Sequence, residues 1–153
     1  MIVAKTISHV KPVFTKHDIS QVFGIPATRV TNWEAGRTIK LRPSLLEASG
    51  RGTRNVYSLA DLYKTGLAIR LLAVGYSGDV VQRAIDEAPR HIEHSEWILV
   101  EHLSNSEVPR IRWSLKVPRF GPNMAHGHIV NLANIRKVVD QLIREEVRDD
   151  EYL

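Results

Sequence analysis

The sequence contains no cysteine, which excludes disulfide bonds, thiolate zinc sites and thiol-based redox sensing. It also contains no apolar run approaching the roughly 20 residues that a membrane-spanning helix needs, and its N-terminus lacks a basic segment followed by an apolar one. With 43% hydrophobic and 25% charged residues, its 153 residues can bury a sizeable core in one or two small domains. We therefore expect a cytoplasmic protein that has no membrane partner.

The residue sets that would indicate an enzyme are missing as well. No nucleophile is accompanied by a base and an orienting residue, and Gly50–Gly52 lacks the Lys-Ser/Thr that follows in a phosphate-binding loop. Two close histidine pairs occur, His91 with His94 and His126 with His128. Without cysteine or a carboxylate trio, we interpret them as surface or loop residues rather than as metal ligands. We predict no enzymatic activity, no metal and no cofactor.

The net charge of +4 is unevenly distributed along the chain. Residues 1–90 contain 13 Lys and Arg against 7 Asp and Glu, whereas residues 91–153 contain 8 against 10. This asymmetry favours a part that faces nucleic acid joined to a part with another role, although an ordinary solvated surface would give the same count. The basic residues between positions 29 and 54 are Arg29, Arg37, Lys40, Arg42, Arg51 and Arg54.

Two short helices are predicted near the N-terminus, after a segment (Met1–Val13) that could be an arm or a short strand. Thr15 stands at an N-cap position with Asp18 three residues later, which predicts a helix over Lys16–Phe23. Gly24 can end this helix with a positive φ, and Pro26 suits the first turn of a second helix that reaches Glu34. We expect Trp33 to pack in the core.

A basic hairpin is predicted after the second helix. Residues 37–57 lack regular periodicity, and they contain the glycine-rich basic run Arg51–Arg54. Such a run suits the tip of a wing that lies along a DNA backbone, and a flexible surface loop is the alternative. Ser58 and Asp61 then predict the start of a third helix, which ends before Gly75.

The remaining sequence predicts a fourth helix, a β-hairpin and a terminal helix. The fourth helix begins after Ser77 and runs to about Ala88. The apolar run Trp97–Val100 and the alternating segment Ile111–Val117 predict two strands of a hairpin. Apolar residues at helical spacing predict an amphipathic helix over Asn134–Val147.

The order of these elements resembles the MerR family of transcriptional regulators over about Phe14 to Ala88. The segments that carry the resemblance are Gly24–Pro26 at the turn, Trp33–Glu34 at the helix end, Arg54–Ser58 before the third helix and Leu71–Ser77 before the fourth. The resemblance implies a helix-turn-helix followed by a wing and two further helices. It also implies dimerisation, for which typical members use a long antiparallel coiled coil.

The sequence departs from the family pattern at several points. Thr31–Glu34 stands where the family usually has Arg-Tyr-Tyr-Glu, Arg54 lies one place earlier than the usual wing arginine, and the link over residues 37–49 is longer. Arg29–Arg37 is similar to the end of the recognition helix, and the residues just after it, in phage-repressor-like (Xre-type) regulators. Because those domains normally have no wing, the hairpin over residues 50–57 favours MerR.

We therefore predict an α+β, mainly α fold. A winged helix-turn-helix DNA-binding domain spans residues 14–88, and a small region at 89–153, with a β-hairpin and a terminal amphipathic helix, serves dimerisation, effector sensing or both. The predicted function is sequence-specific transcriptional regulation, with a homodimer on a near-palindromic operator in double-stranded DNA and a small-molecule effector of unspecified class. An Xre-type regulator, a protein–protein adaptor and, more weakly, a DNA-dependent enzyme or recombination accessory factor remain alternatives. The predicted DNA-contacting residues are Thr28, Arg29, Thr31, Asn32, Arg51, Arg54 and Tyr57.

Overall fold

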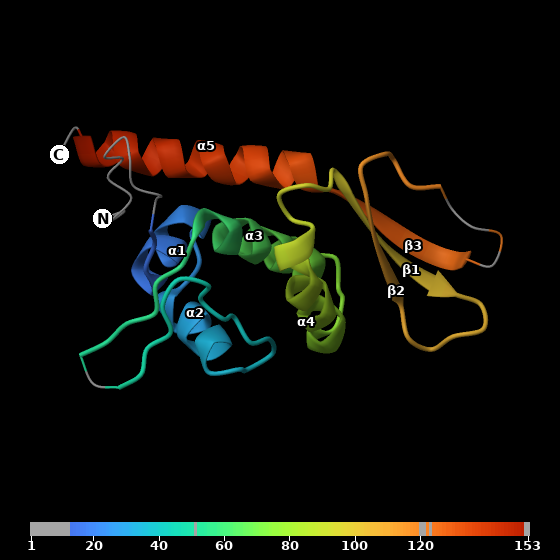
Figure 1. Ribbon diagram of the computed structural model, residues 1–153, viewed down its shortest axis with the longest axis horizontal. Coiled ribbons are helices and arrows are strands. Elements are labelled where there is room, and N and C mark those ends of the chain that lie inside the picture. Colours follow the sequence, from blue (N-terminus) through green and yellow to red (C-terminus); the bar gives the residue numbers. More distant parts are fainter. Residues whose placement is uncertain (1–12, 51, 120–121, 123, 152–153) are drawn as a thin grey trace.

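The computed structural model describes residues 13–50, 52–119, 122 and 124–151. Within these ranges the protein has an α+β fold with five α-helices, one short 3-10 helix and one three-stranded antiparallel sheet (Figure 1). No helix in these ranges is long and apolar enough to cross a membrane. Arg51 and nearly all of the predicted N-terminal arm lie outside the described residues.

The first two helices lie where they were predicted, except that the second begins at Ala27, with Pro26 at its N-cap instead of in its first turn. Helix α1 (Lys16–Phe23) begins with a capping box, in which Asp18 N donates to Thr15 Oγ1 at 3.4 Å and Thr15 N donates to Asp18 Oδ2 at 2.8 Å. Gly24 ends α1 in the left-handed region with a φ of 62°, and α2 (Ala27–Glu34) follows. Local capping and turn signals therefore define both helices.

Two further helices follow the hairpin that comes after α2. Helix α3 (Leu59–Ala73) begins at the predicted N-cap Ser58, and α4 (Gly78–Glu87) continues into a 3-10 turn at Ala88–Arg90. The buried Asp61 side chain accepts hydrogen bonds from Ser58 N at 2.9 Å and from Ser44 N and Oγ at 2.8 Å each. Asp61 thus joins the start of α3 to the base of the hairpin.

The sheet has the strand order β2-β1-β3, and all of its pairing is antiparallel. Strand β1 (Trp97–Leu103) confirms the predicted buried strand. Strand β2 (Arg110–Ser114) is shorter than the predicted segment, which extended to Val117. The Ser114 hydroxyl donates to Lys116 O at 2.6 Å and accepts from Lys116 N at 3.1 Å. This local turn ends the strand and leaves Val117 60% exposed.

The third strand, β3 (Met124–Asn131), was not predicted from the sequence. It pairs with β1 along its whole length, and Gly127 lies so close to β1 that an added Cβ would be 2.9 Å from Val100 O. The backbone of β1 therefore leaves room only for glycine at this position of β3.

Helix α5 (Leu132–Glu151) follows β3 directly and extends beyond the predicted Asn134–Val147. It packs back on α1 and α3, and the Tyr63 hydroxyl donates to Asp140 Oδ1 at 2.6 Å. At Gly66, α3 and α5 are so close that an added Cβ would lie 3.1 Å from Ile135 Cγ2 and 3.2 Å from Val139 Cγ2. The small residue allows α5 to cover α3.

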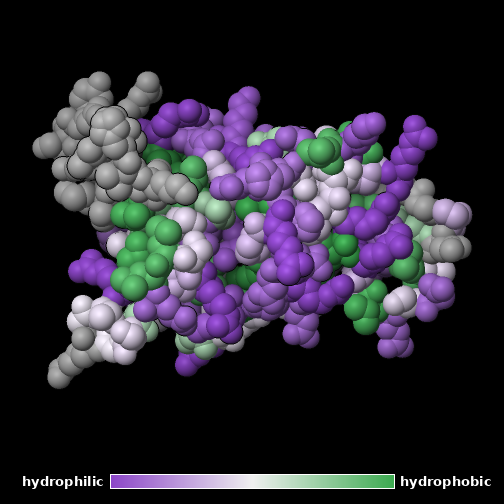
Figure 2. Space-filling model, viewed as in Figure 1, coloured by the Kyte–Doolittle hydropathy of each residue, from purple (hydrophilic) through white to green (hydrophobic). Residues whose placement is uncertain are grey.

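One cluster of buried residues includes side chains from both predicted halves of the chain, from Phe14 and Ile19 to Leu132 and Val139. The division near residue 88 stays a prediction. The face in Figure 2 is mostly hydrophilic, and its apolar side chains form separate patches. In Figure 1, α2 and the hairpin that follows it project on the side of the molecule opposite α5.

Candidate nucleic-acid interface

The turn between α1 and α2 sets the direction of α2. The Ser20 hydroxyl donates to Ile25 O at 2.6 Å, and Ile25 N donates to Ser20 O at 3.1 Å. Val30 is fully buried and Trp33 is 5% exposed, so one side of α2 faces the core as predicted for Trp33. The other side of α2 must therefore face solvent.

The four predicted contact residues of α2 are all exposed: Thr28, Arg29, Thr31 and Asn32. The Thr31 hydroxyl donates to Ala27 O at 3.1 Å within the helix, and Asn32 Oδ1 accepts from Arg37 Nη1 at 3.3 Å. These side chains present hydrogen-bonding groups and positive charge on one surface. Short polar residues and arginine are the types that contact base edges in a major groove.

The loop after α2 is attached to α4, which holds Arg37 next to the exposed face of α2. Lys40 N donates to Gln82 Oε1 at 2.6 Å, and Gln82 Nε2 donates to Lys40 O at 3.3 Å. Gly78 at the start of α4 leaves room for this loop, since a Cβ there would lie 2.2 Å from Thr38 O.

The hairpin between α2 and α3 is held by two isolated antiparallel bridges, Leu46 with Val56 and Phe14 with Tyr57. Near its tip, Thr53 Oγ1 accepts from Ser49 N and Gly50 N at 3.0 Å each. Arg54 lies beyond this turn and is exposed.

Glu34, the last residue of α2, connects this helix to the hairpin. Its Oε2 atom accepts hydrogen bonds from Asn55 Nδ2 at 2.7 Å and from the Tyr57 hydroxyl at 2.5 Å. Burial, together with the Glu34 carboxylate, raises the pKa of Tyr57 well above its ordinary value, so the hydroxyl remains a donor. This pair of bonds fixes the hairpin relative to the exposed face of α2.

The predicted phosphate contact by Tyr57 is wrong as a direct contact. Its side chain is 0% exposed, and its hydroxyl is already bound to Glu34. Tyr57 can instead position the hairpin. Its burial depends on the bridge with Phe14, a residue far away in the sequence, so the local pattern around Tyr57 could not predict it.

The structure adds residues that the sequence did not identify. Lys16 and His17, at the start of α1, line a hollow together with Arg54 and Asn55 of the hairpin. Among the described residues, neither Arg29 nor Arg54 has a carboxylate partner. The positive charge near α2 and the hairpin is therefore available to an external anion.

The histidines form aromatic contacts, some of them between the two halves of the chain. The His102 and His126 rings stack with centroids 4.1 Å apart, and the Tyr76 hydroxyl is hydrogen-bonded to His128 Nδ1. Burial, and then the neighbouring His126 and His128, lower the pKa of His102. Within the described ranges, no three His, Asp or Glu side chains are arranged to hold a metal ion.

Comparison with known proteins adds no assignment: no protein-family model matches the chain, and no curated protein sequence matches it.

Proposed function

We propose that the protein is a sequence-specific DNA-binding transcriptional regulator with a winged helix-turn-helix resembling that of the MerR family. In this proposal α2 is the recognition helix and the hairpin over residues 44–57 is the wing. The observation that carries the proposal is the double hydrogen bond from Asn55 and Tyr57 to Glu34, which couples the hairpin to the end of α2.

The exposed face of α2 suits base recognition. A major groove about 12 Å wide admits a single helix, and base edges are contacted by short polar and arginine side chains. Thr28 and Arg29, at the exposed start of α2, are the proposed base-reading residues, and Thr31 and Asn32 supply further contacts. Arg29 would pair with guanine, the commonest partner of arginine.

The hairpin suits contact with the DNA backbone. Arg54 is exposed, and among the described residues it has no acidic partner, so phosphate binding would release counterions without first breaking an ion pair. Lys16 and His17 border the same hollow and add positive or hydrogen-bonding groups at its edge. This surface would set the position of the protein on the duplex, while α2 would supply the sequence preference.

A homodimer follows from the proposed mode of binding. Two copies of α2 would occupy half-sites about one helical turn, or a multiple of it, apart, so the operator would be near-palindromic. Removing α5 would expose the surface of α3 that it covers. The oligomeric state should therefore be measured by sedimentation of the intact chain, with and without a duplex that contains two half-sites.

The test is selection of bound duplexes from a random pool, followed by affinity measurements on the selected site. Arg54→Ala should weaken binding to all sequences and reduce the slope of log affinity against log salt by about one unit. Arg29→Ala should also relax the preference at one base pair of each half-site. Arg144→Ala, on the exposed surface of α5, removes the same charge and should change affinity little. Failure to enrich any sequence, with equal effects of the three variants, would support the adaptor alternative.

A further inference from the structure

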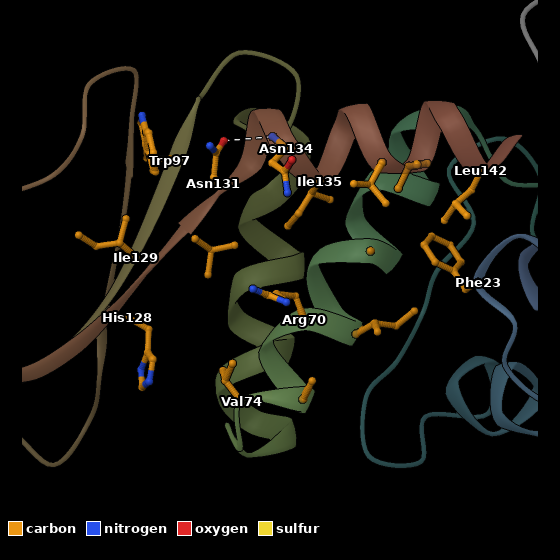
Figure 3. A pocket seen from close by; sticks show the side chains of 16 residues that line it. Phe23, Arg70, Val74, Trp97, His128, Ile129, Asn131, Asn134, Ile135 and Leu142 are labelled. Atoms are coloured by element: carbon orange, nitrogen blue, oxygen red, sulfur yellow. Dashed lines mark hydrogen bonds between the residues drawn. The ribbon is translucent and has the colours of Figure 1, made fainter. Parts of the chain in front are cut away.

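A groove of about 610 Å³ lies between α3, α5 and β3, away from the proposed DNA-binding surface (Figure 3). Its volume falls within the range of about 300–1,000 Å³ found for small-molecule sites. Both predicted halves of the chain line it, since Phe23 and α3 form one wall and β3 with α5 forms the other. The groove therefore lies where a ligand would contact both halves at once.

One end of the groove is apolar. Phe23, Val139 and Leu142 line this end, and Figure 3 shows Phe23 and Leu142 next to each other. The neighbouring Val138 is 45% exposed, so apolar surface at the rim remains in contact with water. Burial of such surface by a ligand is favourable, because it removes apolar area from water.

The other end of the groove contains polar side chains together with the apolar Trp97 and Ile129. Asn131, Asn134 and His128 lie at this end in Figure 3, and Arg70 of α3 lies between them and the apolar end. Within the described residues, no protein acceptor or carboxylate is paired with the Arg70 guanidinium, and no acidic residue lines the groove. An anionic group would therefore complement this end, because a guanidinium binds a carboxylate through two parallel hydrogen bonds.

The groove is elongated, and its polar side chains lie toward one end. Its lining extends along α5 from Asn134 to Leu142, which corresponds to about 12 Å at 1.5 Å per residue. A compact anion such as phosphate would leave the apolar end empty, and an uncharged alkane would leave Arg70 without a partner. A long molecule with one anionic end would fill the apolar end of the groove and also pair with Arg70.

We propose that this groove binds an alkyl carboxylate of the fatty-acid type. The carboxylate lies at Arg70, with Asn131 and Asn134 farther along the groove on one side, and the alkyl chain extends toward Phe23 and Leu142 on the other. This proposal does not depend on DNA binding, and its test is carried out without DNA.

Calorimetric titration of the full chain with decanoate, decanol and decylamine tests the proposal, because these probes share a chain and differ in their end group. We expect decanoate to bind about tenfold more tightly than decanol, as an arginine–carboxylate contact implies, and decylamine to bind most weakly. Higher salt should reduce this preference, because Arg70 is exposed. Tryptophan fluorescence, to which Trp97 in the groove contributes together with Trp33 and Trp113, gives a second readout.

Variants assign the effect to the groove. Arg70→Gln should reduce decanoate affinity to that of decanol, Arg70→Lys should retain part of the preference, and the control Arg90→Gln should match the unmodified protein. Val138→Trp, at a half-exposed rim position, should weaken the binding of both decanoate and decanol. Circular dichroism of each variant establishes that it is folded. The proposal is overturned if decanoate does not bind, if decanol binds equally well, or if folded Arg70→Gln retains full affinity. It is also overturned if sedimentation shows that a second copy occupies the groove and Val138→Trp dissociates it.

Discussion

Replacement of Glu34 by alanine should destabilise the protein and loosen the hairpin. The change removes the acceptor of the Tyr57 hydroxyl, which is fully buried, and of the Asn55 amide. A buried donor left without a partner costs about 1–3 kcal/mol, whereas water can replace the acceptor of the half-buried Asn55. We expect a loss of about 2 kcal/mol, or about 4–8 °C in Tm for a chain of this length.

A double-mutant cycle separates the hydrogen bond from the side chains that form it. Tyr57→Phe should lower the free energy of unfolding by about 1 kcal/mol, because the Glu34 carboxylate still accepts the hydrogen bond from Asn55 and can accept another from water. In the double variant no buried hydroxyl is left unpaired, so the combined loss should be about 1 kcal/mol smaller than the sum of the single losses. Urea denaturation followed by circular dichroism measures all four proteins.

Glu47→Ala is the matched control for Glu34→Ala, since Glu47 is an exposed acid on the same hairpin. It should change stability by less than about 0.5 kcal/mol. Both variants remove one negative charge, so a greater loss of DNA affinity in Glu34→Ala reports the position of the hairpin rather than charge. Equal stabilities of the two variants, or strict additivity in the cycle, would refute the proposed coupling.

Three further predictions concern other parts of the fold. Asp61→Ala removes a helix cap and the acceptor of the Ser44 backbone amide, so it should lower the free energy of unfolding by about 3 kcal/mol in urea denaturation. The control Asp79→Ala, an exposed change in the first turn of α4, should lower it by less than about 1 kcal/mol. Gly66→Val should cost about 1–3 kcal/mol because its side chain would collide with α5, and an unchanged Tm would contradict the close packing there. Because the pKa of His102 is lowered on folding, its neutral form stabilises the protein above pH 6.5, and this stability is lost as the pH falls toward the lowered value. Tm should therefore drop as the pH falls below about 6.5, less so in His102→Gln, and identical pH profiles would exclude this role.

Local signals were sufficient to predict the helices. Thr15 with Asp18, and Ser58 with Asp61, form the capping boxes that their spacing predicts, and Gly24 has the expected positive φ. These features depend on hydrogen bonds within a few residues, so their physics is present in the sequence itself.

Features that depend on distant partners were missed or misassigned. Strand β3 contains glycine and polar histidines, and it becomes a strand because β1 pairs with it. Tyr57 is buried because Phe14 and Glu34 meet it, and the nearness of Lys16 and His17 to the hairpin also depends on that packing. The sequence around each of these residues does not identify the distant partner that determines its role.

The location of α2 on DNA is the central claim, and tethered cleavage tests it most directly. Because the sequence contains no cysteine, Thr28→Cys and Arg144→Cys each provide a single attachment point for an iron chelate that cleaves nearby DNA. Residue 28 lies on the exposed face of α2, and residue 144 lies on α5, on the opposite side of the molecule in Figure 1. On a selected duplex, we predict cleavage from residue 28 within each half-site and none from residue 144. Cleavage from residue 144 with none from residue 28 would contradict the proposed interface.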